Sequence, residues 1–313
     1  MPYSKKKIIC IETIEQLETL SNIDLNKLNI DTVYITSDTI NKDNEKIFTN
    51  LNKLIENNIN LGIRLSRLGT DEQSIKSFFY DIKDAQLNKK PKSNILLYNS
   101  IMVRNIDQLS FASSLLKKIT NNNFKFNREE CKFTICIDWS LNVYNNETRK
   151  FLISNLNNYI NEECIKFTYN LEQNTNELKL LDMDELVFYG YVPVMATSNC
   201  ILKSTDKCIY PDRNYDDLEP YENDNIFTSA HTYIIDRKKE KVNVKTYCKF
   251  CYNQIFNPEP IFLCDMRGEL SKINYEYERY DFTFEDGQRV IKILVNEERP
   301  HKFTRGHIKR GID

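Results

Sequence analysis

Short apolar runs rich in β-branched residues alternate with longer segments of helical period along most of the chain. Runs of this length and composition are typical of buried strands. Strands that alternate strictly with helices indicate parallel pairing through right-handed crossovers. Eight runs predict strands, at Ile8–Glu12, Asp31–Thr36, Ile59–Leu65, Asn94–Asn99, Lys132–Asp138, Ile165–Tyr169, Glu185–Val194 and Tyr280–Phe284.

The segments between these strands carry the apolar spacing of amphipathic helices. Thr13-x-x-Gln16 is a capping box that opens the first helix. In the second helix, an i, i+4, i+7, i+8 pattern places Ile47, Leu51, Leu54 and Ile55 on one face. Further helices are predicted near residues 75–82, 109–119, 148–156, 177–181, 268–273 and 288–295.

Eight strand–helix units favour an α/β fold of the (β/α)8 TIM-barrel type over an open sheet. The chain of 313 residues has 7 glycines and no G-x-G-x-x-G fingerprint after its first strand, which argues against a dinucleotide-binding fold. No Gly-, Ser- or Pro-rich linker divides it. We therefore predict one barrel domain over residues 1–313, with a cysteine-containing β-hairpin insertion at about 196–264, after the seventh strand.

The composition is that of a globular protein without a strong overall charge. Hydrophobic residues make up 41% of the chain, charged residues 28%, and the formal net charge is −2, so the basic footprint of tight phosphate binding is absent. The first residues contain no apolar run of secretory length, and no later run approaches a membrane span. We expect a cytoplasmic protein without membrane association, whose nine cysteines are reduced thiols or metal ligands.

Four cysteines gather in the segment that breaks the strand–helix alternation. Cys200 and Cys208 are separated by seven residues, and Cys248 and Cys251 form a C-x-x-C. The chain between the pairs can fold back, so the four thiols can converge on one centre, and four thiolates suit zinc or an iron–sulfur cluster. The alternative is four unrelated buried thiols. Four further cysteines fall in or beside apolar segments and are interpreted as core residues, namely Cys10, Cys136, Cys164 and Cys264.

Polar residues collect where the predicted strands end, which is where barrel enzymes carry their active sites. Asp138 and Glu172 can supply acid–base chemistry or hold a cationic or hydroxylated ligand. Alternatively, they cap the following helices or pair with Arg64. The polar residues after the predicted strands are Arg64, Arg67, Asn99, Asp138, Asn142, Asn145 and Glu172.

A basic segment near the C-terminus, Phe303–Arg310, is a second candidate for ligand binding. Its Arg305, His307 and Arg310 can bind a phosphate or a carboxylate. The alternative is a tail that closes one end of the barrel and neutralises nearby acids.

Several of these motifs together resemble peptidase family U32, the collagenase-like peptidases. The run YGYVPVM is followed by two cysteines, by IIDR with a hairpin, and by C-x-x-x-I-x-N-x-x-P, while FTRGHIKRGI is similar to the segment that closes the barrel in that family. Asp138-x-x-Leu-Asn142-x-x-Asn145 resembles its D-x-x-L-N-x-x-N segment, and Asn170-Leu171-Glu172 resembles its S-x-E-L. The best match is to the C-terminal barrel of the long clostridial members, without their other domains.

The resemblance implies a 4Fe-4S cluster held by four cysteines at the mouth of a barrel. Cys200, Cys208 and Cys251 match family positions. Cys248 departs from the pattern, because the family's third cysteine lies in the loop soon after Cys208, and residues 209–225 contain none. Either Cys248 substitutes for that ligand, or the site holds zinc or no metal.

Three functions compete. Relatives with this cysteine region carry out oxygen-independent hydroxylation, which implies an iron–sulfur enzyme acting on RNA or on a small aromatic substrate, with Asp138, Glu172 and Arg64 as catalytic residues. The runner-up is a peptidase, although no nucleophile–base arrangement is recognisable. The third is a non-catalytic barrel with a structural zinc or no metal that binds a partner protein. A partner that supplies the domains of the long family members fits any of them.

Overall fold

The computed structural model describes residues 5–37, 45–68, 95–96, 98–121, 125–126, 133–156, 160–208, 229–248 and 251–310. The helix predicted near residues 75–82 lies outside this part of the chain. In the described part, the predicted capping box is confirmed, because the Thr13 side chain accepts from the Gln16 backbone N–H and the Gln16 side chain accepts from the Thr13 N–H.

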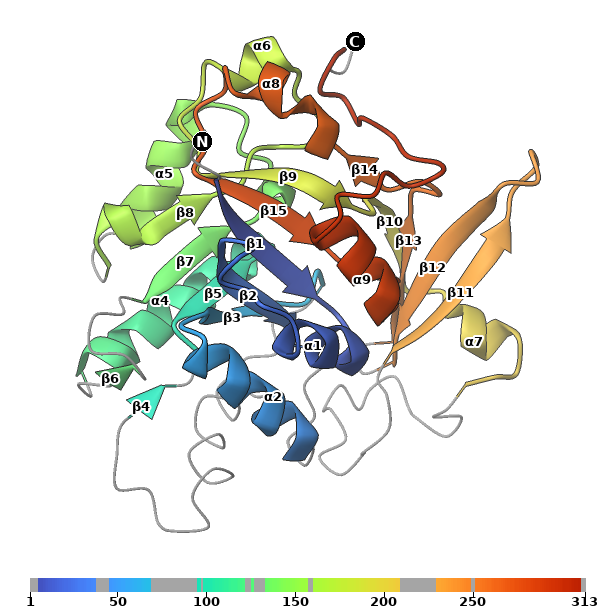
Figure 1. Ribbon diagram of the computed structural model, residues 1–313, viewed down its shortest axis with the longest axis horizontal. Coiled ribbons are helices and arrows are strands. Elements are labelled where there is room, and N and C mark those ends of the chain that lie inside the picture. The colour runs from blue at the N-terminus through green and yellow to red at the C-terminus, as the bar shows by residue number, and fades with distance from the viewer. Residues whose placement is uncertain are drawn as a thin grey trace.

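The centre of the fold is a nine-stranded sheet in the order β14-β9-β15-β1-β2-β3-β5-β7-β8 (Figure 1). Its neighbouring strands pair in parallel, except β14, which is antiparallel to β9. The strands are β1 (Lys6–Ile11), β2 (Ile30–Thr36), β3 (Asn60–Arg64), β5 (Ser100–Val103), β7 (Thr134–Ile137), β8 (Ile165–Phe167), β9 (Glu185–Gly190), β14 (Ile261–Phe262) and β15 (Tyr277–Asp281).

The sheet is curled rather than flat, so that its inner face is enclosed. The edge strand β8 returns towards β9, where an isolated parallel bridge joins Thr168 to Glu185. Two backbone hydrogen bonds accompany it, from Tyr169 N to Glu185 O at 2.8 Å and from Asp184 N to Phe167 O at 2.9 Å. Side chains that point to the inner face therefore meet one another across the curl.

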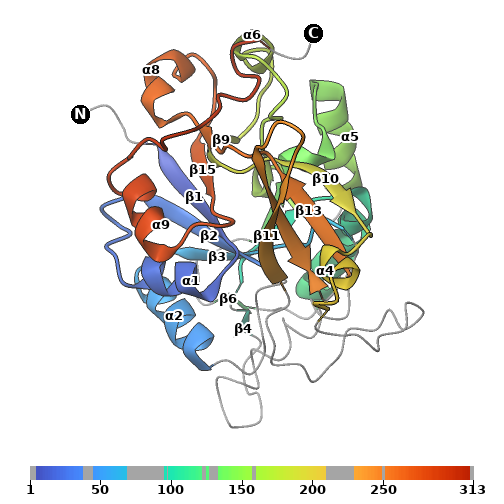
Figure 2. The same cartoon turned by 90° about the vertical axis from the view of Figure 1, so that its right-hand side faces the viewer.

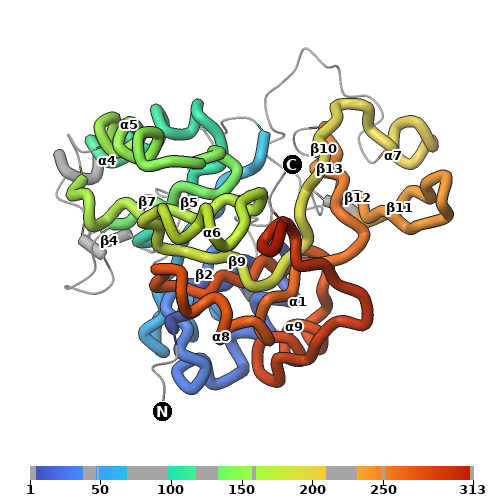
Figure 3. Tube along the Cα trace, turned by 90° about the horizontal axis from the view of Figure 1, so that it is seen from above, coloured from blue at the N-terminus to red at the C-terminus, as the bar shows by residue number. Residues whose placement is uncertain are grey.

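Helices cover the outer face of the sheet. Figures 1 and 2 show α1, α2 and α9 on one side of the molecule and α4 and α5 on the other, and Figure 3 shows the same separation from above. The helices are α1 (Ile14–Ser21), α2 (Glu45–Glu56), α4 (Ile106–Asn121), α5 (Asn146–Leu156), α6 (Thr175–Leu178), α7 (Ile201–Ser204), α8 (Arg267–Leu270) and α9 (Gly287–Leu294).

After β9 the chain leaves the parallel pattern and forms a second sheet. This antiparallel sheet has the order β10-β13-β12-β11, and the chain returns to the main sheet at β14 (Figure 1). The predicted insertion thus begins a few residues earlier than expected and contains four strands, not one hairpin. Its strands are β10 (Pro193–Thr197), β11 (Ser229–Ile235), β12 (Lys241–Tyr247) and β13 (Tyr252–Phe256); two short strands elsewhere, β4 (Ile95–Leu96) and β6 (Lys125–Phe126), pair with each other.

The prediction of an eightfold (β/α)8 barrel is wrong. The main sheet has nine strands, one of them antiparallel, and a separate four-stranded sheet follows β9 where a helix would continue the repeat. The helix after β8 is only the four-residue α6. The α/β class holds, but the regular repeat was inferred from local periodicity, which does not report the direction in which a strand pairs.

Two strands also differ in position from the prediction. The fourth strand of the parallel set is β5, which begins directly after the predicted Asn94–Asn99, and the last is β15, which begins three residues before the predicted Tyr280–Phe284. The two-residue β4 lies within the predicted Asn94–Asn99 but pairs only with β6. The exact register came from pairing with β3 and β9, which local composition does not specify.

The two faces of the sheet carry different side chains. The outer face belongs to the large apolar core under the helices, whereas a small separate cluster fills part of the inner face. Because successive side chains of a strand alternate between faces, Ile9 and Ile11 join the outer core while Ile8 and Cys10 point inward. The inner cluster consists of Ile8, Cys10, Tyr34, Met102, Cys136 and Tyr277.

Gly62 makes room for Tyr34 on the inner face. A Cβ atom at position 62 would overlap the Tyr34 ring, whose hydroxyl is hydrogen-bonded to Ser100. We expect Gly62→Ala to lower the free energy of unfolding by about 1–3 kcal/mol, the usual cost of overpacking a core. Urea denaturation measures this cost. Gly268→Ala is the matched control, since a Cβ there meets nothing within 4 Å, and equal behaviour of the two variants would contradict the prediction.

No helix in the described part of the chain is long and apolar enough to cross a membrane.

Candidate functional site

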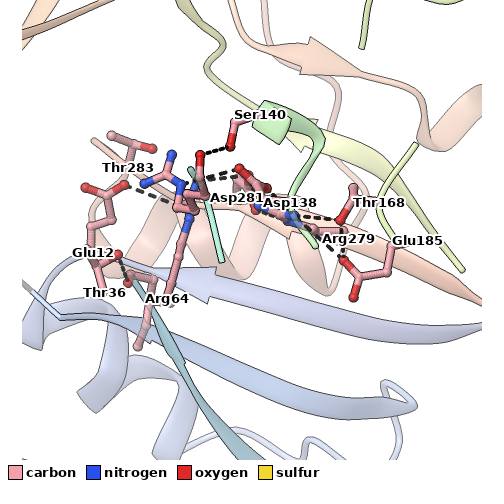
Figure 4. A network of polar contacts seen from close by, with 12 residues as sticks. Glu12, Thr36, Arg64, Asp138, Ser140, Thr168, Glu185, Arg279, Asp281 and Thr283 are labelled. Carbon is pink, nitrogen blue, oxygen red and sulfur yellow. Dashed lines mark hydrogen bonds and ion pairs between the residues drawn. The ribbon is translucent and has the colours of Figure 1, made fainter. Parts of the chain in front are cut away.

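A network of buried charges lines the inner face of the sheet, from the carboxyl ends of β1, β3, β7 and β15 to Glu185, the first residue of β9. Figure 4 shows Glu12 and Arg64 at one end of it, Thr168 and Glu185 at the other, and Asp138 and Asp281 between them. All its ionisable side chains are almost completely excluded from solvent. We call it the charge network; its ionisable members are Glu12, Arg64, Arg104, Asp138, Glu185, Lys245, Arg279 and Asp281.

Arg279, on β15, is the centre of the charge network. Its guanidinium binds both carboxylate oxygens of Asp281, with Nε–Oδ1 2.7 Å and Nη2–Oδ2 2.9 Å. Nη1 lies 2.7 Å from Asp138 Oδ1 and 3.7 Å from Glu185 Oε2, and donates to Thr168 Oγ1 at 3.2 Å. One fully buried cation therefore holds carboxylates from three separate strands or strand ends.

Glu12, which follows β1, connects the charge network to the second sheet. Its Oε2 accepts from Lys245 Nζ at 2.6 Å and from Tyr247 Oη at 3.0 Å, both on β12. Its Oε1 lies 3.4 Å from Arg64 Nη1, and Arg64 Nη2 lies 3.3 Å from Asp281 Oδ2. The antiparallel sheet is thereby fixed over the strand ends through ionic contacts.

Neighbouring cations lower the pKa values of three carboxylates and keep them ionised, namely Glu12, Asp138 and Asp281. Burial alone would raise their pKa values, but Arg279, Arg104 and Arg64 hold the pKa of Asp138 well below its usual range. Asp281 has a lowered pKa for the same reason, through Arg279 and Arg64. Such carboxylates are charge partners and hydrogen-bond acceptors rather than proton donors at neutral pH.

Glu185 is the exception. Its burial is not fully offset by Arg279, so its pKa rises to about 7. The side chain accepts from Cys136 Sγ at 3.2 Å and from Thr168 Oγ1 at 3.0 Å. A carboxyl group that titrates near neutrality can exchange a proton at neutral pH, so Glu185 is the member of the charge network whose charge state is most sensitive to pH.

The two cysteine segments lie side by side in the second sheet. Strand β10 pairs with β13 through Thr197 and Asn253, so the chain before Cys200 runs beside the chain after Cys251. Asn253 also donates from Nδ2 to Asn199 O at 2.6 Å. Cys248 and Cys251 form the turn between β12 and β13, where Cys251 N donates to Cys248 O at 3.4 Å and Cys251 has φ +51°. Segments about fifty positions apart in sequence thus share one end of the second sheet.

The four predicted metal-binding thiols are close enough to interact electrostatically. Burial raises the pKa of Cys248, and negative charge on Cys200, Cys208 or Cys251 raises it further. Within the described residues, no three Cys, His, Asp or Glu side chains are arranged as ligands of one ion. Thiolate ligands suit a soft metal. To bind one ion, the four thiols would have to come closer together than they are in this structure. Metal binding stays a prediction.

Two stacked tyrosines connect this thiol turn to the strand ends. Tyr247 and Tyr252, which flank the two cysteines of the turn, stack with ring centroids 4.7 Å apart and an interplanar angle of 13°. Tyr247 donates to Glu12, and the Tyr252 hydroxyl is hydrogen-bonded to Ser66 Oγ at 2.8 Å. The thiols are therefore anchored over the same end of the sheet that carries the charge network.

Among the predicted site residues, the structure brings Arg64 and Asp138 together and separates Asn99 from them. Arg64 and Asp138 are joined through Asp281 and Arg279. Asn99 precedes β5 instead of following a strand, and donates to Asn60 Oδ1, at the start of β3, at 2.8 Å. It lies at the amino end of the strands, opposite the charge network.

Glu172, Asn142 and Asn145 lie on exposed loops after β7 and β8. The Tyr144 hydroxyl donates to Glu172, and Asn142 accepts from Asn170 Nδ2 at 3.3 Å in a left-handed backbone conformation. Asn145 accepts from the Thr148 N–H at 2.8 Å, at the start of α5. Asn145 therefore caps the start of α5.

Arg305 has a partner within the chain. Its guanidinium binds both oxygens of Asp265, with Nη2–Oδ2 2.8 Å, and donates to Phe262 O at 2.6 Å. His307 lies on the exposed turn that follows. The segment is connected to the strand-end loops, since Thr175 N donates to Ile308 O at 2.9 Å. These contacts correspond to a structural tail rather than to a free anion site.

Four cysteines were interpreted as core residues, and this is confirmed because all four are buried: Cys10, Cys136, Cys164 and Cys264. The sequence analysis missed most of the charge network, including Arg279, Asp281, Glu185, Glu12, Arg104 and Lys245. One signal was present: the strand Tyr277–Asp281 has two charged residues between its tyrosines and a third directly after them. Charges at such positions indicate paired, buried ions.

Comparisons with known proteins add little to this site. No protein-family model matches the chain, and no curated protein matches it. A solved structure described as an uncharacterized B. cereus protein is similar over 90% of this chain and 100% of that chain, with 9% identity and a TM-score of 0.35. A likeness at that TM-score carries no argument, so the U32 resemblance stays a prediction.

Proposed function

We propose that this protein is an enzyme whose substrate binds at the carboxyl ends of the parallel strands, beside a thiolate metal centre formed by Cys200, Cys208, Cys248 and Cys251. The observation that carries the proposal is the placement of these four thiols. They come from two distant segments that lie side by side through the pairing of β10 with β13, and Tyr247 and Tyr252 join the pair Cys248 and Cys251 to the charge network and to Ser66.

The donor set supports a soft metal. Four cysteine thiolates are the ligands of structural zinc and of 4Fe-4S clusters, and both require reduced cysteines. The proposal therefore implies the cytoplasm, where thiols stay reduced. A 4Fe-4S cluster would supply one-electron redox chemistry next to the substrate, as the resemblance to the oxygen-independent hydroxylases suggests. RNA or a small aromatic compound is then the expected substrate class.

The charge network supports the catalytic part. It forms a rigid, water-excluded floor in which Asp138 and Asp281 are ionised and Glu185 titrates near neutrality, with a pKa of about 7. Fixed charges in a dry site act on a bound substrate more strongly than the same charges in water. In this arrangement Arg64 and Asp138, at the carboxyl ends of their strands, orient the substrate, and Glu185, at the start of β9, sets the charge of the network by gaining or losing a proton.

The test is anaerobic metal and sulfide analysis of the purified protein beside two variants. We expect iron and acid-labile sulfide in the wild type, with visible charge-transfer absorbance, and loss of both in Cys248→Ala. Cys164→Ala is the matched control, because Cys164 is a buried thiol outside the turn, and it should keep the full metal content. A wild type that contains neither iron nor zinc sinks the proposal.

The same experiment separates the alternatives. Stoichiometric zinc without sulfide, also lost in Cys248→Ala, would favour the non-catalytic scaffold with a structural metal. The peptidase alternative requires an imidazole beside a thiol. His231 instead contacts Asn243 Oδ1 at 3.1 Å and lies over the Phe284 ring at 4.3 Å, so no observation favours that function.

A further inference from the structure

Arg67 differs from every arginine of the charge network. It follows β3 by three residues, and within the described residues its Nη1 is buried without a hydrogen-bond partner. No carboxylate in that part of the chain forms an ion pair with it, whereas Arg64, Arg104 and Arg279 each bind one. A sheltered guanidinium without a counter-ion is costly for a fold, and such groups commonly serve ligands.

The surroundings of Arg67 are positive. Burial lowers the pKa of Arg67, and the neighbouring Arg104 lowers it further. Arg104 is itself committed to Asp138 through a long contact, Nε–Oδ2 3.4 Å. Five cations, counting Arg67, thus face three carboxylates with lowered pKa values and Glu185, whose pKa is about 7. Among the described residues, the site therefore has more cationic than anionic side chains, although Asp138 offsets part of the effect on Arg67; an anion would neutralise the remainder.

The guanidinium is held in place before any ligand arrives. Its Cζ lies 5.0 Å from the centroid of the Trp139 ring. The backbone around it is fixed by the start of α4, since Gln108 donates to Ser66 O at 2.7 Å and Asn105 to Arg67 O at 3.4 Å. A guanidinium stacked on an aromatic face keeps its edge N–H groups free, and this edge matches the two oxygens of a carboxylate.

We propose that Arg67, stacked on Trp139 beside Arg104, binds a carboxylate group of a small-molecule substrate. This inference rests on the proposed function, because it places the anionic end of the substrate at the strand ends, where Tyr252 links Ser66 to the thiol turn. A single unpaired guanidinium offers one charge and one planar fork. A carboxylate satisfies both, whereas a phosphate dianion requires more donors.

Trp139 supplies the measurement, because it is the only tryptophan in the chain. The full-length protein is titrated with benzoate, with benzamide as the neutral match, and the tryptophan fluorescence is followed. We expect a saturable change with benzoate and none with benzamide. In Arg67→Gln the apparent affinity for benzoate should fall at least about tenfold, as for loss of a charge-assisted bond. Arg67→Lys keeps the charge without the fork and should be intermediate.

Arg289→Gln is the matched control, since Arg289 pairs with Glu298 on the surface; it should bind benzoate as the wild type does. A structural role for Arg67 makes a different prediction. If Arg67 supported the fold, Arg67→Gln would lower the urea midpoint, whereas removal of an unpartnered charge should leave the midpoint unchanged or raise it. Equal responses to benzoate and benzamide, or wild-type binding by Arg67→Gln, overturn the inference, as does saturable binding of inorganic phosphate in place of benzoate.

This titration does not depend on the metal. Benzoate binding without iron or zinc in the protein would leave the carboxylate site standing and remove the thiolate centre. Metal binding without benzoate binding would support the thiolate centre and remove the carboxylate site. The two proposals therefore fail separately.

Discussion

Arg279→Met is expected to destabilise the protein by about 3–5 kcal/mol, the usual cost of removing one partner from a buried ionic group. The substitution keeps much of the side-chain volume but leaves Asp281 and Asp138 without the cation that neutralises them at 2.7 Å. The two buried carboxylates keep only the longer contacts of Asp138 to Arg104 at 3.4 Å and of Asp281 to Arg64 at 3.3 Å, so each must either stay charged with less compensation or take up a proton. Urea denaturation at neutral pH measures the loss.

The control for this substitution is Arg289→Met. Arg289 pairs with Glu298 at 3.1 Å, but the two side chains are 30% and 47% exposed, and surface pairs of this kind contribute about 0–1 kcal/mol. Arg279→Lys keeps the charge, loses the planar fork, and should fall between the two; it also provides a foldable variant if Arg279→Met does not fold. A loss in Arg279→Met no larger than that of the control would show that the charge network does not hold the strands together.

The second large effect is a dependence of stability on pH through Glu185. Its pKa is about 7 in the folded protein, against an ordinary value of 4.5. In the unfolded chain Glu185 loses its proton near its ordinary pKa, whereas the folded protein keeps the proton until about pH 7. The stability that Glu185 confers is therefore complete below pH 4.5 and is lost as the pH rises through 7.

Glu185→Gln should remove this contribution. Since one pKa unit corresponds to about 1.4 kcal/mol, the variant should gain about 2–3 kcal/mol relative to the wild type between about pH 5 and pH 8. Urea denaturation of both proteins at the two pH values gives the difference. Glu298→Gln, at a carboxylate whose side chain is 47% exposed, should show no such divergence. If the difference in the free energy of unfolding between Glu185→Gln and the wild type is the same at about pH 5 and pH 8, Glu185 does not titrate between these pH values and the prediction is wrong.

Local sequence patterns predicted the individual strands and helices of the parallel sheet more accurately than the way in which the strands pair. Thr13 and Gln16 form the predicted capping box, and the predicted strands at Ile8–Glu12 and Asp31–Thr36 lie on β1 and β2. These features depend on neighbours within a few residues. Asn94–Asn99 was wrong because the apolar run there extends into β5, and only pairing with β3 sets where the strand begins. That shift moved Asn99 to the opposite end of the sheet.

The candidate site was predictable where its residues stand out from their surroundings. Cys248-x-x-Cys251 is visible in any reading of the sequence, and Arg64 and Asp138 follow apolar runs. Arg279 and Glu185 lie inside strands, where a charge normally argues against burial. Their ionic contacts depend on the curl of the sheet, which brings the end of β7 close to the neighbouring strands β9 and β15. Sequence distance gives no indication of such contacts.

The sequence by itself determined the α/β class, most elements of the parallel sheet, a break in the pattern after the seventh strand and the identity of the thiols, because each depends on composition or on short-range periodicity. The tertiary structure alone decided the strand order, the four-stranded sheet over the strand ends and the pairing of Arg279 with Asp138 and Asp281. Several of those features depend on contacts between residues more than a hundred positions apart, such as Arg279 with Asp138 and β1 with β15, whose energies exist only once the sheet has curled and excluded water.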